Sequence, residues 1–237
     1  MTENIKPGTR LYACASLVSD GAVLCDVGTD HAYLPIYLCK KGAVSRAVAS
    51  DIKEGPLARA KEHIALCGLS DAISARLTPG LCGMEGEGFT DIVIAGMGGL
   101  MIRDIIDAAP FVRDASVALI LQPMKNADML RLYLAENGFE ITHEQLAFDE
   151  GKLYQIMRAV YDGKKRRFDD VSLLLGEKNI AAREQNRGLF SMLCDKYLVM
   201  YKKKADGLPK DSEEYAKAKY IFNEISALSA EVKGEAK

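Results

Sequence analysis

The 237-residue chain has little of several features that would narrow its class at once. It contains no tryptophan, three histidines and seven prolines, and its formal net charge is only −2. A near-neutral chain gives no sign, taken as a whole, of a polyanionic partner. With so few prolines and with 49% apolar residues, the composition excludes a collagen-like or disordered chain. The sequence is that of an ordinary globular protein.

Signals for metal binding, export and membrane insertion are also missing. The cysteines show no CxxC or Cys/His spacing of a zinc site, so we expect no metal and interpret them as reduced core residues. The N-terminus lacks the basic and apolar regions of a signal peptide, and no stretch approaches the roughly 18 consecutive apolar residues of a membrane span. We therefore expect a cytoplasmic monomer with no membrane partner. The cysteines are Cys14, Cys25, Cys39, Cys67, Cys82 and Cys194.

Residues 1–162 alternate short apolar runs with helical patterns. Apolar runs that end in a turn signal predict strands, and the periodic stretches after them predict helices. A final pair of strand-like segments around an Asp-Glu-Gly turn predicts a hairpin. Together they describe an open, mostly parallel, Rossmann-like α/β sheet with helices on both faces. Strands are expected at 22–25, 44–50, 73–77, 91–96, 116–121, 139–148 and 152–161, and helices at 33–41, 55–66, 100–108 and 127–137.

The composition changes after residue 162. Residues 163–237 contain no strand-like run and show two helical patterns, at 170–204 and 212–233. They carry 16 Lys+Arg and 12 Asp+Glu, a charge of +4, whereas residues 1–162 carry 15 and 21, a charge of −6. We therefore expect an acidic α/β domain followed by a mildly basic helical domain, an antiparallel coiled coil. Its apolar seam is predicted from Leu173, Leu174, Ile180, Leu189, Leu193, Tyr197 and Met200.

Acidic residues and a glycine follow the first two predicted strands. Open α/β sheets bind ligands at the carboxyl ends of their strands, beside the switch in strand order. Gly28, two residues after Asp26, leaves the backbone bare for a ligand to approach, and Asp51 can accept hydrogen bonds from two ribose hydroxyls. This arrangement indicates a nucleotide-like ligand.

The same turn favours one nucleotide cofactor over another. Asp30 and Ala32 stand where a dinucleotide fingerprint would have further glycines. Asp26, Asp30 and Asp51 together would repel a pyrophosphate but attract a sulfonium and an α-amino group. The acidic turn therefore favours S-adenosylmethionine over NAD, and an NAD-dependent oxidoreductase is the less favoured alternative.

Three further motifs lie at predicted strand ends. The first puts the titratable side chains of Asp30 and His31 above the expected ligand, unless Asp30 is simply a helix cap. In Ala95–Gly99, three glycines leave room for a flat ring close to the backbone, whereas a plain turn usually needs one. In Gln122–Asn126, an amide pair and a cation stand at the same rim, unless the last residue caps the next helix.

Two basic runs lie in the helical segment. Each is compatible with a solvated linker or, near a helix end, with a favourable interaction with the helix dipole. Two such runs on a separate, positively charged arm also favour contact with RNA. They are Lys164, Lys165, Arg166 and Arg167, and Lys202, Lys203 and Lys204.

Taken together, six short sequence motifs of this chain resemble those of the bacterial tRNA (adenine-22-N1)-methyltransferases. The resemblance runs from about residue 10 to residue 160, and the helical tail matches that family's architecture. One departure is Arg76–Gly80, where the family would have a Gly-Asn-Gly-like loop after the third strand. The matching strings are Arg10-Leu11, Asp26–Pro35, Gly55-Pro56, Asp91–Gly99, Leu121–Pro123 and Asn137-Gly138.

The resemblance implies a class I enzyme that transfers a methyl group from S-adenosylmethionine to N1 of adenosine 22, in the D arm of tRNA. We expect the extruded base to be received by Gly98, Gly99, Gln122 and Pro123. The implied cofactor-binding residues are Arg10, Asp26, Gly28, Asp30, His31, Asp51, Ile52, Leu77, Thr78, Ala95, Gly96 and Met97.

The chemistry of this reaction can be reasoned independently. N1 of adenine has an in-plane lone pair and needs no prior deprotonation, so catalysis depends on holding nitrogen, methyl and sulfur in line. Because N1 lies on the Watson–Crick edge, the base must leave its partners to react. We assign to Asp30 the stabilisation of the cationic product and to His31 the positioning of cofactor or base.

The basic helical domain is then expected to hold the folded tRNA by its phosphates. Two alternatives stay open. One is a methyltransferase of the same fold that acts on another RNA position, a small molecule or a protein. The other is a non-catalytic RNA-binding protein with a vestigial pocket.

Overall fold

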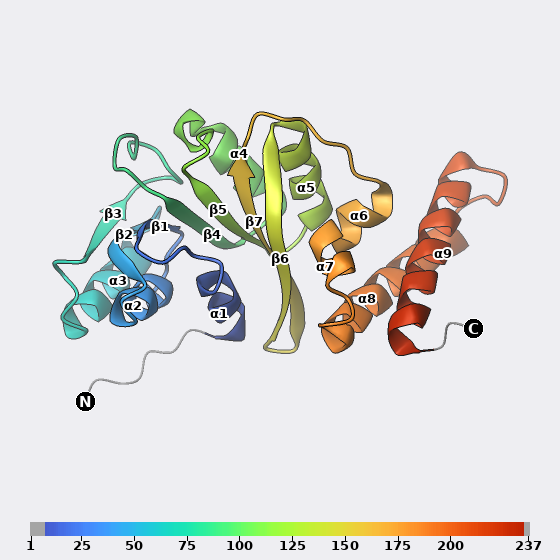
Figure 1. Cartoon of the computed structure of the whole chain (residues 1–237), viewed down its shortest axis with the longest axis horizontal. Coiled ribbons are helices and arrows are strands. Elements are labelled where there is room, and N and C mark those ends of the chain that lie inside the picture. Colours follow the sequence, from blue (N-terminus) through green and yellow to red (C-terminus); the bar gives the residue numbers. More distant parts are fainter. Residues whose placement is uncertain (1–7, 235–237) are drawn as a thin grey trace.

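A twisted sheet runs through the first two-thirds of the molecule in the computed structural model, which describes residues 8–234 (Figure 1). Within this range seven strands pair in the order β3-β2-β1-β4-β5-β7-β6. The first five are parallel, whereas β7 pairs antiparallel with both β5 and β6. The predicted open, mostly parallel sheet with a terminal hairpin is confirmed. The strands are β1 (Ala22–Val27), β2 (Val44–Asp51), β3 (Ile73–Leu77), β4 (Asp91–Met97), β5 (Ala118–Pro123), β6 (Phe139–Asp149) and β7 (Lys152–Tyr161).

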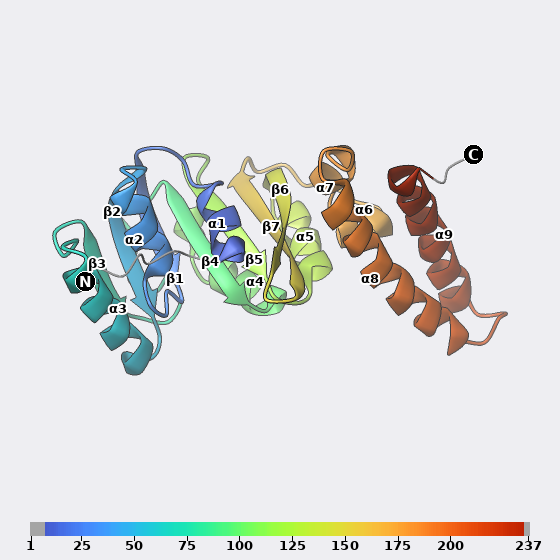
Figure 2. The same ribbon diagram turned by 90° about the horizontal axis from the view of Figure 1, so that it is seen from below.

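Helices cover both faces of the sheet (Figures 1 and 2). One buried cluster joins α1, α2 and α3 to one face, and a second joins α4 and α5 to the other. The core is therefore two apolar layers separated by the sheet, as expected for a doubly covered α/β domain. These helices are α1 (Thr9–Ala15), α2 (Tyr33–Lys40), α3 (Glu54–Leu66), α4 (Gly99–Asp107) and α5 (Ala127–Glu136), with a short 3₁₀ turn at Pro110–Val112.

The central strands are almost continuously apolar because helices bury them from both sides. All six residues of β5 are buried, and so are five of the six residues of β1. β1 lies between β2 and β4. From β1 the strand order runs to β2 and β3 on one side and to β4 and β5 on the other. A sheet of this kind has a crevice where the order switches, at the carboxyl end of β1. The fold thus positions a ligand site above Val27.

A helical arm, residues 170–233, packs against the β6–β7 edge of the sheet (Figure 2). Its two long helices lie side by side and antiparallel in both views. They share a buried seam that includes Leu193, Tyr197, Ile221 and Ile225. No helix within residues 8–234 is long and apolar enough to cross a bilayer. The arm consists of α6 (Asp170–Leu175), α7 (Glu177–Ala181), α8 (Arg187–Asp206) and α9 (Glu213–Lys233).

The prediction of one helix over 170–204 is wrong, because three helices occupy that range. α6 ends at Leu175. The next residue, Gly176, has a φ of +87° that favours glycine, and a turn over 182–186 separates α7 from α8. A Cβ at Gly176 would also collide with the Glu144 carboxylate. The breaks let α6 and α7 fold back against α5 and β6. Met200, predicted in the seam, is 46% exposed and lies outside it, as does Leu173.

A buried ion pair joins the sheet to the arm. Arg131 of α5 is 1% exposed, and its Nε donates to Glu144 Oε1 of β6 at 2.7 Å. The same guanidinium donates to the Leu173 carbonyl and to Gln155 Oε1, both at 2.7 Å, while Glu144 Oε2 accepts the Lys178 N–H at 3.0 Å. Every strong donor and acceptor of the pair is thus occupied, which a buried ion pair requires. These contacts connect α5, β6 and β7 with α6 and α7.

Candidate active site

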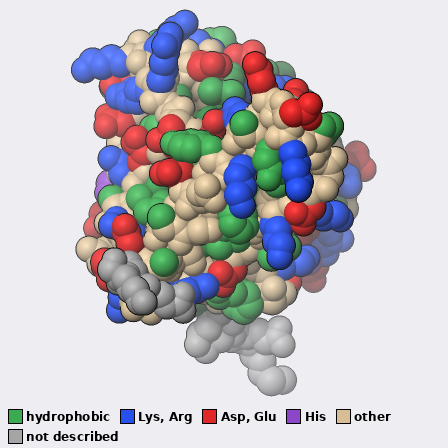
Figure 3. Space-filling view, turned by 90° about the vertical axis from the view of Figure 1, so that its right-hand side faces the viewer, with side chains coloured by type: hydrophobic (Ala, Val, Ile, Leu, Met, Phe, Trp, Pro, Cys, Tyr) green, Lys and Arg blue, Asp and Glu red, His purple; other side chains and the backbone are tan. Residues whose placement is uncertain are grey.

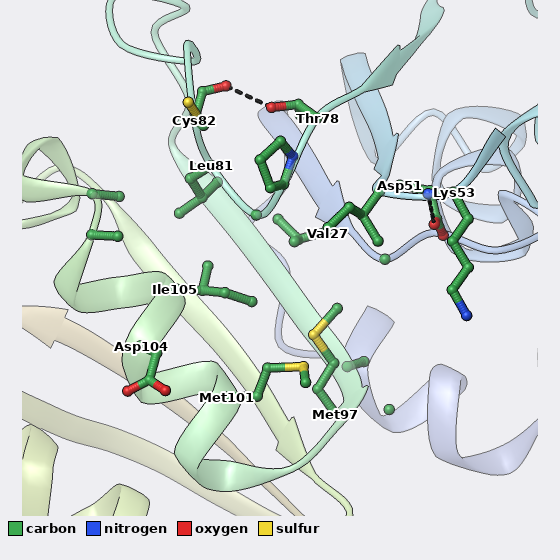
Figure 4. Close-up of a pocket in the computed structure, with 18 of the residues that line it drawn as sticks. Val27, Asp51, Lys53, Thr78, Leu81, Cys82, Met97, Met101, Asp104 and Ile105 are labelled. Carbon is green, nitrogen blue, oxygen red and sulfur yellow. Dashed lines mark hydrogen bonds between the residues drawn. The ribbon is translucent and has the colours of Figure 1, made fainter.

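A cavity of about 720 Å³ opens at the carboxyl ends of β1 to β4, where the strand order switches (Figure 4). Its walls are mostly apolar, with Asp51 and Lys53 on one side and Asp104 on the other. Concave sites of this composition are typical of small-molecule binding. The apolar side chains that face one another in Figure 4 are Val27, Leu81, Met97, Met101 and Ile105.

The turn after β1 keeps the floor of the cavity bare. Gly28 has a φ of +73°, and its N–H and that of Thr29 both donate to the Ser50 carbonyl at 2.9 Å. A Cβ at Gly28 would collide with the terminal methyl group of Met97. Any other residue would therefore strain the turn and fill space at the floor of the cavity.

Asp51 ends β2 and presents its carboxylate at the edge of the cavity. It is 9% exposed, and its Oδ1 accepts the Lys53 N–H at 2.9 Å while Oδ2 accepts the Asp30 N–H at 3.4 Å. An ionised carboxylate has about four acceptor sites. Acceptor capacity therefore remains for two hydroxyl groups of a ligand, the role that the sequence predicts.

The segment after β3 forms the wall next to Asp51. Thr78 donates its N–H to the Asp51 carbonyl at 3.0 Å and its hydroxyl to the Cys82 carbonyl at 2.8 Å. Cys82 itself is exposed and lines the cavity, so the prediction that the cysteines are core residues is wrong there. At the departure from the family pattern, Arg76 pairs with Glu87 at 2.7 Å, outside the cavity lining.

The remaining predicted cofactor residues are only partly assembled here. Ile52, Ala95, Gly96 and Met97 line the cavity, whereas Leu77 is 49% exposed and lies outside the lining. Two walls of the larger cavity were not predicted from the sequence. One is Pro79–Leu81, and the other is the face of α4 that carries Met101 and Ile105. The i, i+4 spacing of the two α4 residues is the signal that could have indicated this face.

A second cavity of about 200 Å³ adjoins the first. The two share Gly28, Asp30 and Ala95. Arg10 of α1 and Asp26 of β1 bring opposite charges into the smaller cavity. A ligand group with both an anionic and a cationic end would therefore find a partner for each. The other lining residues are Leu11, Thr29, His31, Tyr33 and Leu34.

Asp26 is a buried acid with one strong neighbour. Its side chain accepts the Thr29 hydroxyl at 2.6 Å, and the residue is only 5% exposed. Burial raises the pKa of Asp26 to about 6, against the lowering effect of the Thr29 hydroxyl and with a smaller raising effect from the Asp51 charge. A cationic group nearby would favour the ionised form.

Asp30 and His31 lie between the two cavities and the solvent. The Asp30 side chain is 62% exposed and pairs with Arg59 at 3.3 Å and with His31 Nε2 at 3.7 Å. The helix-cap interpretation of Asp30 is wrong, since Ala32 occupies the N-cap position of α2. The His31 ring stacks on Tyr33 at 5.2 Å between centroids, and its buried Nδ1 has no partner among the described residues.

Gln122 and Pro123, predicted to receive the target base, are both buried. The Gln122 Oε1 accepts Arg10 Nη1 at 2.6 Å and the Gly96 N–H at 3.1 Å. Neither side chain is open to a base in this structure, which argues against the predicted role. Asn126, the alternative cap, stands at the N-cap position of α5 but makes no capping hydrogen bond with its side chain.

The loops after β4 and β5 are joined at the rim of the site. Met124 donates its N–H to the Met97 carbonyl, and Gly99 donates to the Lys125 carbonyl, both at 2.8 Å. A Cβ at Gly99 would collide with the neighbouring loop, so glycine allows this close approach. Met124 and Lys125 are exposed here, next to Gly98. They are better placed to meet a base than the two residues before them.

The two basic runs differ in their structural roles. Arg166 pairs with Asp162 at 2.6 Å and with Glu140 at 3.5 Å, which raises its pKa, and its N–H donates to the Ala135 carbonyl. It therefore anchors the segment before α6 to α5 and β6. The exposed members of the runs are Lys164, Lys165 and Arg167 in the linker, and Lys202, Lys203 and Lys204 near the end of α8.

Comparison with known proteins identifies the family. Residues 8–157 match the family model of a methyltransferase domain. The tRNA (adenine(22)-N(1))-methyltransferase of Bacillus subtilis is 31% identical over 222 residues, which is 94% of this chain and 87% of that protein.

Solved structures agree in fold over the full length. The crystal structure of the B. subtilis m1A22 tRNA methyltransferase superimposes with a TM-score of 0.76 and 27% identity, covering 99% of this chain and all of that one. A Streptococcus pneumoniae protein, a candidate tRNA (m1A22) methyltransferase solved in complex with S-adenosyl-L-methionine, gives a TM-score of 0.79 and 32% identity over 93% and 98% of the two chains. The chain belongs to the family of tRNA (adenine(22)-N(1))-methyltransferases.

Proposed function

We propose that this chain transfers a methyl group from S-adenosylmethionine to N1 of adenosine 22 in tRNA. The observation that carries the proposal is the pair of joined cavities at the switch in strand order, with Asp51 at one and Arg10 and Asp26 at the other. The 31% identity to the B. subtilis enzyme over nearly the whole chain supports this substrate over another. When bound, S-adenosylmethionine supplies a methyl group on a positively charged sulfur.

The residues of both cavities fit that cofactor. The larger cavity has apolar walls for an adenine ring and the Asp51 carboxylate for two ribose hydroxyls. The smaller cavity offers Arg10 to an α-carboxylate and Asp26 to an α-amino group. The bare turn at Gly28, where a Cβ would collide, lies in the lining of both. The other predicted cofactor residues, except Leu77, take their roles from their place in these linings.

The chain's contribution to the chemistry is positioning. The joined loops place Gly98, Met124 and Lys125 at the rim, where an extruded adenine can lie against the Gly98 backbone, whereas Gly99, also predicted to receive the base, is buried beneath the second loop. Its N1 lone pair then attacks the methyl carbon as the carbon–sulfur bond breaks, which leaves the positive charge on the base. Asp30 lines both cavities and stabilises that charge. His31 stacks on Tyr33 and so keeps the wall of the smaller cavity in place.

The helical arm is proposed to hold the tRNA backbone. Exposed lysines of the linker and of α8 supply positive charge without base specificity. On the outer face of the arm, basic side chains stand beside exposed hydrophobic ones (Figure 3). Tyr220 is 54% exposed, and Lys204 lies 5.6 Å from the Tyr201 ring centroid. Such a mixed surface suits phosphates and unstacked bases.

Three further expectations stay predictions. They are a cytoplasmic location, a monomeric state, and a separate RNA-contacting domain formed by residues 163–237.

The decisive experiment maps the methylated position. The purified chain is incubated with S-adenosylmethionine and an unmodified tRNA that carries adenosine at position 22, and the product is sequenced by nuclease digestion and mass spectrometry. We expect N1-methyladenosine at position 22, and none in a matched tRNA with guanosine there. Methylation at another site would support the alternative substrate, and binding of tRNA without methylation would support the non-catalytic alternative.

A further inference from the structure

We infer that the buried amide of Gln122 is a positioning residue for the amino-acid end of the cofactor and acts through Arg10 and Gly96. The inference deepens the proposed function and rests on it. Gln122 is 0% exposed near the end of β5. Its single oxygen accepts two hydrogen bonds, the first from the Gly96 N–H at 3.1 Å and the second from Arg10 Nη1 at 2.6 Å. One atom thus joins the N-terminal helix to the loop that ends β4.

The first of these contacts accounts for a local irregularity of the sheet. The register between β4 and β5 shifts between Ala95 and Met97, which makes Gly96 an extra residue with a φ of +79°. Such bulges take one N–H out of the ladder and often lie beside active sites. The Gln122 oxygen accepts that N–H, which would otherwise lose a partner at considerable cost. It thereby fixes the loop where Ala95 and Gly96 line the larger cavity.

The second contact fixes the cation of the smaller cavity. Arg10 comes from α1, where its backbone N–H donates to Asp149 Oδ2 at 3.1 Å and its guanidinium lies 5.6 Å from the Tyr154 ring centroid. Gln122 gives the guanidinium a directional acceptor, at 2.6 Å. A guanidinium has five N–H donors in a rigid fork, so donors remain for a ligand in the smaller cavity.

The neutral charge of the amide is part of the arrangement. A carboxylate at position 122 would orient the guanidinium equally well, but it would also compensate most of its charge. Glutamine holds Arg10 and leaves that charge for an anionic group of the ligand. In the proposed cofactor this group is the α-carboxylate, and the α-amino group faces Asp26 on the same cavity.

Calorimetry with two ligands can separate a role of Gln122 toward the amino-acid end from a general effect on the fold. S-adenosylhomocysteine has the amino-acid end, whereas 5′-methylthioadenosine has the same adenosine and sulfur without it. We expect Gln122→Met to weaken binding of S-adenosylhomocysteine by about tenfold or more, the usual effect of losing a hydrogen bond to a charged group. Binding of 5′-methylthioadenosine should weaken several-fold less, because only the Gly96 contact borders the cavity assigned to the adenosine. Arg10→Met should weaken S-adenosylhomocysteine alone, and adding Gln122→Met to it should cost no more than Gln122→Met costs for 5′-methylthioadenosine.

Gln145→Met is the matched control. Gln145 also ties α1 to the sheet, through the Ala13 carbonyl and through the Ser16 hydroxyl at 2.8 Å, but it does not touch Arg10. We expect it to leave both affinities unchanged. Gln122→Glu keeps the acceptor oxygen and so retains the fold even where Gln122→Met does not. It should still lose affinity for S-adenosylhomocysteine, because the guanidinium charge is compensated.

Three results would overturn the inference: equal weakening of both ligands, additive effects in the double variant, or a Gln122→Glu variant that binds S-adenosylhomocysteine as the wild type does. In each case tight binding by the wild type would leave the proposed function standing. If the wild type bound neither ligand more tightly than about millimolar, the cofactor assignment and this inference would both fail.

Discussion

The α/β body and the helical arm differ in the sign of their net charge and in how deeply they bury charged groups. The body carries a charge of −6 over residues 1–162 and buries charged groups in its cavities, as at Asp26 and Asp51. The segment 163–237 carries +4, and the lysines that the structure describes in it, up to residue 234, are exposed. Replacing a buried charged group changes stability or binding strongly, whereas replacing one exposed charge among several changes them little. Substitutions should therefore divide sharply between the two regions.

The largest effect is expected at the joint between body and arm. Arg131→Met leaves Glu144 buried without its partner, so we expect the free energy of unfolding to fall by about 3–5 kcal/mol in chemical denaturation. The double variant Arg131→Met with Glu144→Met should lose much less, because no charge is left buried. Arg113→Met, which breaks an exposed pair with Asp107, should cost below about 1 kcal/mol. Equal losses in all three variants would contradict the role of the buried pair.

The next effect concerns the acid buried in the body. The folded state holds the Asp26 proton more tightly than the unfolded chain, because burial raises its pKa from 3.8 to about 6. Its contribution to the free energy of unfolding therefore falls as the pH rises from about 4 to about 6 and is level above that range. Asp26→Asn should remove this dependence and stabilise the free protein at pH 7.5 by up to about 3 kcal/mol. The same variant should bind S-adenosylmethionine more weakly. A variant no more stable than the wild type at pH 7.5 would show that burial of the charge is not costly.

A smaller effect should be confined to the cofactor. Asp51→Ala removes the proposed acceptor of two ribose hydroxyls, and we expect S-adenosylmethionine affinity in calorimetry to fall by about 2 kcal/mol. The affinity for tRNA, measured by filter binding, should stay within about twofold. Asp71→Ala, an exposed carboxylate before β3, is the control and should change neither value. Unchanged cofactor affinity in Asp51→Ala would end the ribose assignment.

The smallest effect should come from the arm. Replacing Lys202, Lys203 and Lys204 with glutamine should weaken tRNA binding by about 1 kcal/mol or less and lower the slope of affinity against salt by up to about 2 to 3. Cofactor affinity should not change. The control is Lys40→Gln with Lys41→Gln, which removes exposed charge at the end of α2. If tRNA affinity and its salt dependence matched the wild type, the arm would have only a structural role.

Much of the body could be predicted from sequence because its signals are local. The strands β1, β2 and β4 are apolar runs that stop at a glycine or an acid, so Asp26, Gly28 and Asp51 were expected at one edge, and the structure puts all three in the linings of two joined cavities. The hairpin was equally plain from its turn. Both features depend on neighbours within a few residues, which a linear pattern can show.

The parts that were missed depend on distant contacts. Gln122 was expected to face a base, but its amide is taken up by Arg10, 112 positions away. The break at Gly176 depends on the Glu144 carboxylate of β6, which leaves no room for a Cβ. Apolar periodicity runs through this glycine unchanged, so the sequence predicted one long helix. In both cases a tertiary partner overrode a local preference.

The position of the β6–β7 hairpin has a consequence for reach. In the order β4-β5-β7-β6, two antiparallel strands stand between the last parallel strand and the helical arm. Neighbouring strands are about 4.8 Å apart, so the hairpin sets the arm off from β5 by roughly 10 Å. Because the buried Arg131 pair fastens the arm there, this offset is a fixed length of the molecule. If the arm binds the tRNA backbone as proposed, this fixed offset would select the target nucleotide by its distance from the bound backbone as well as by its base.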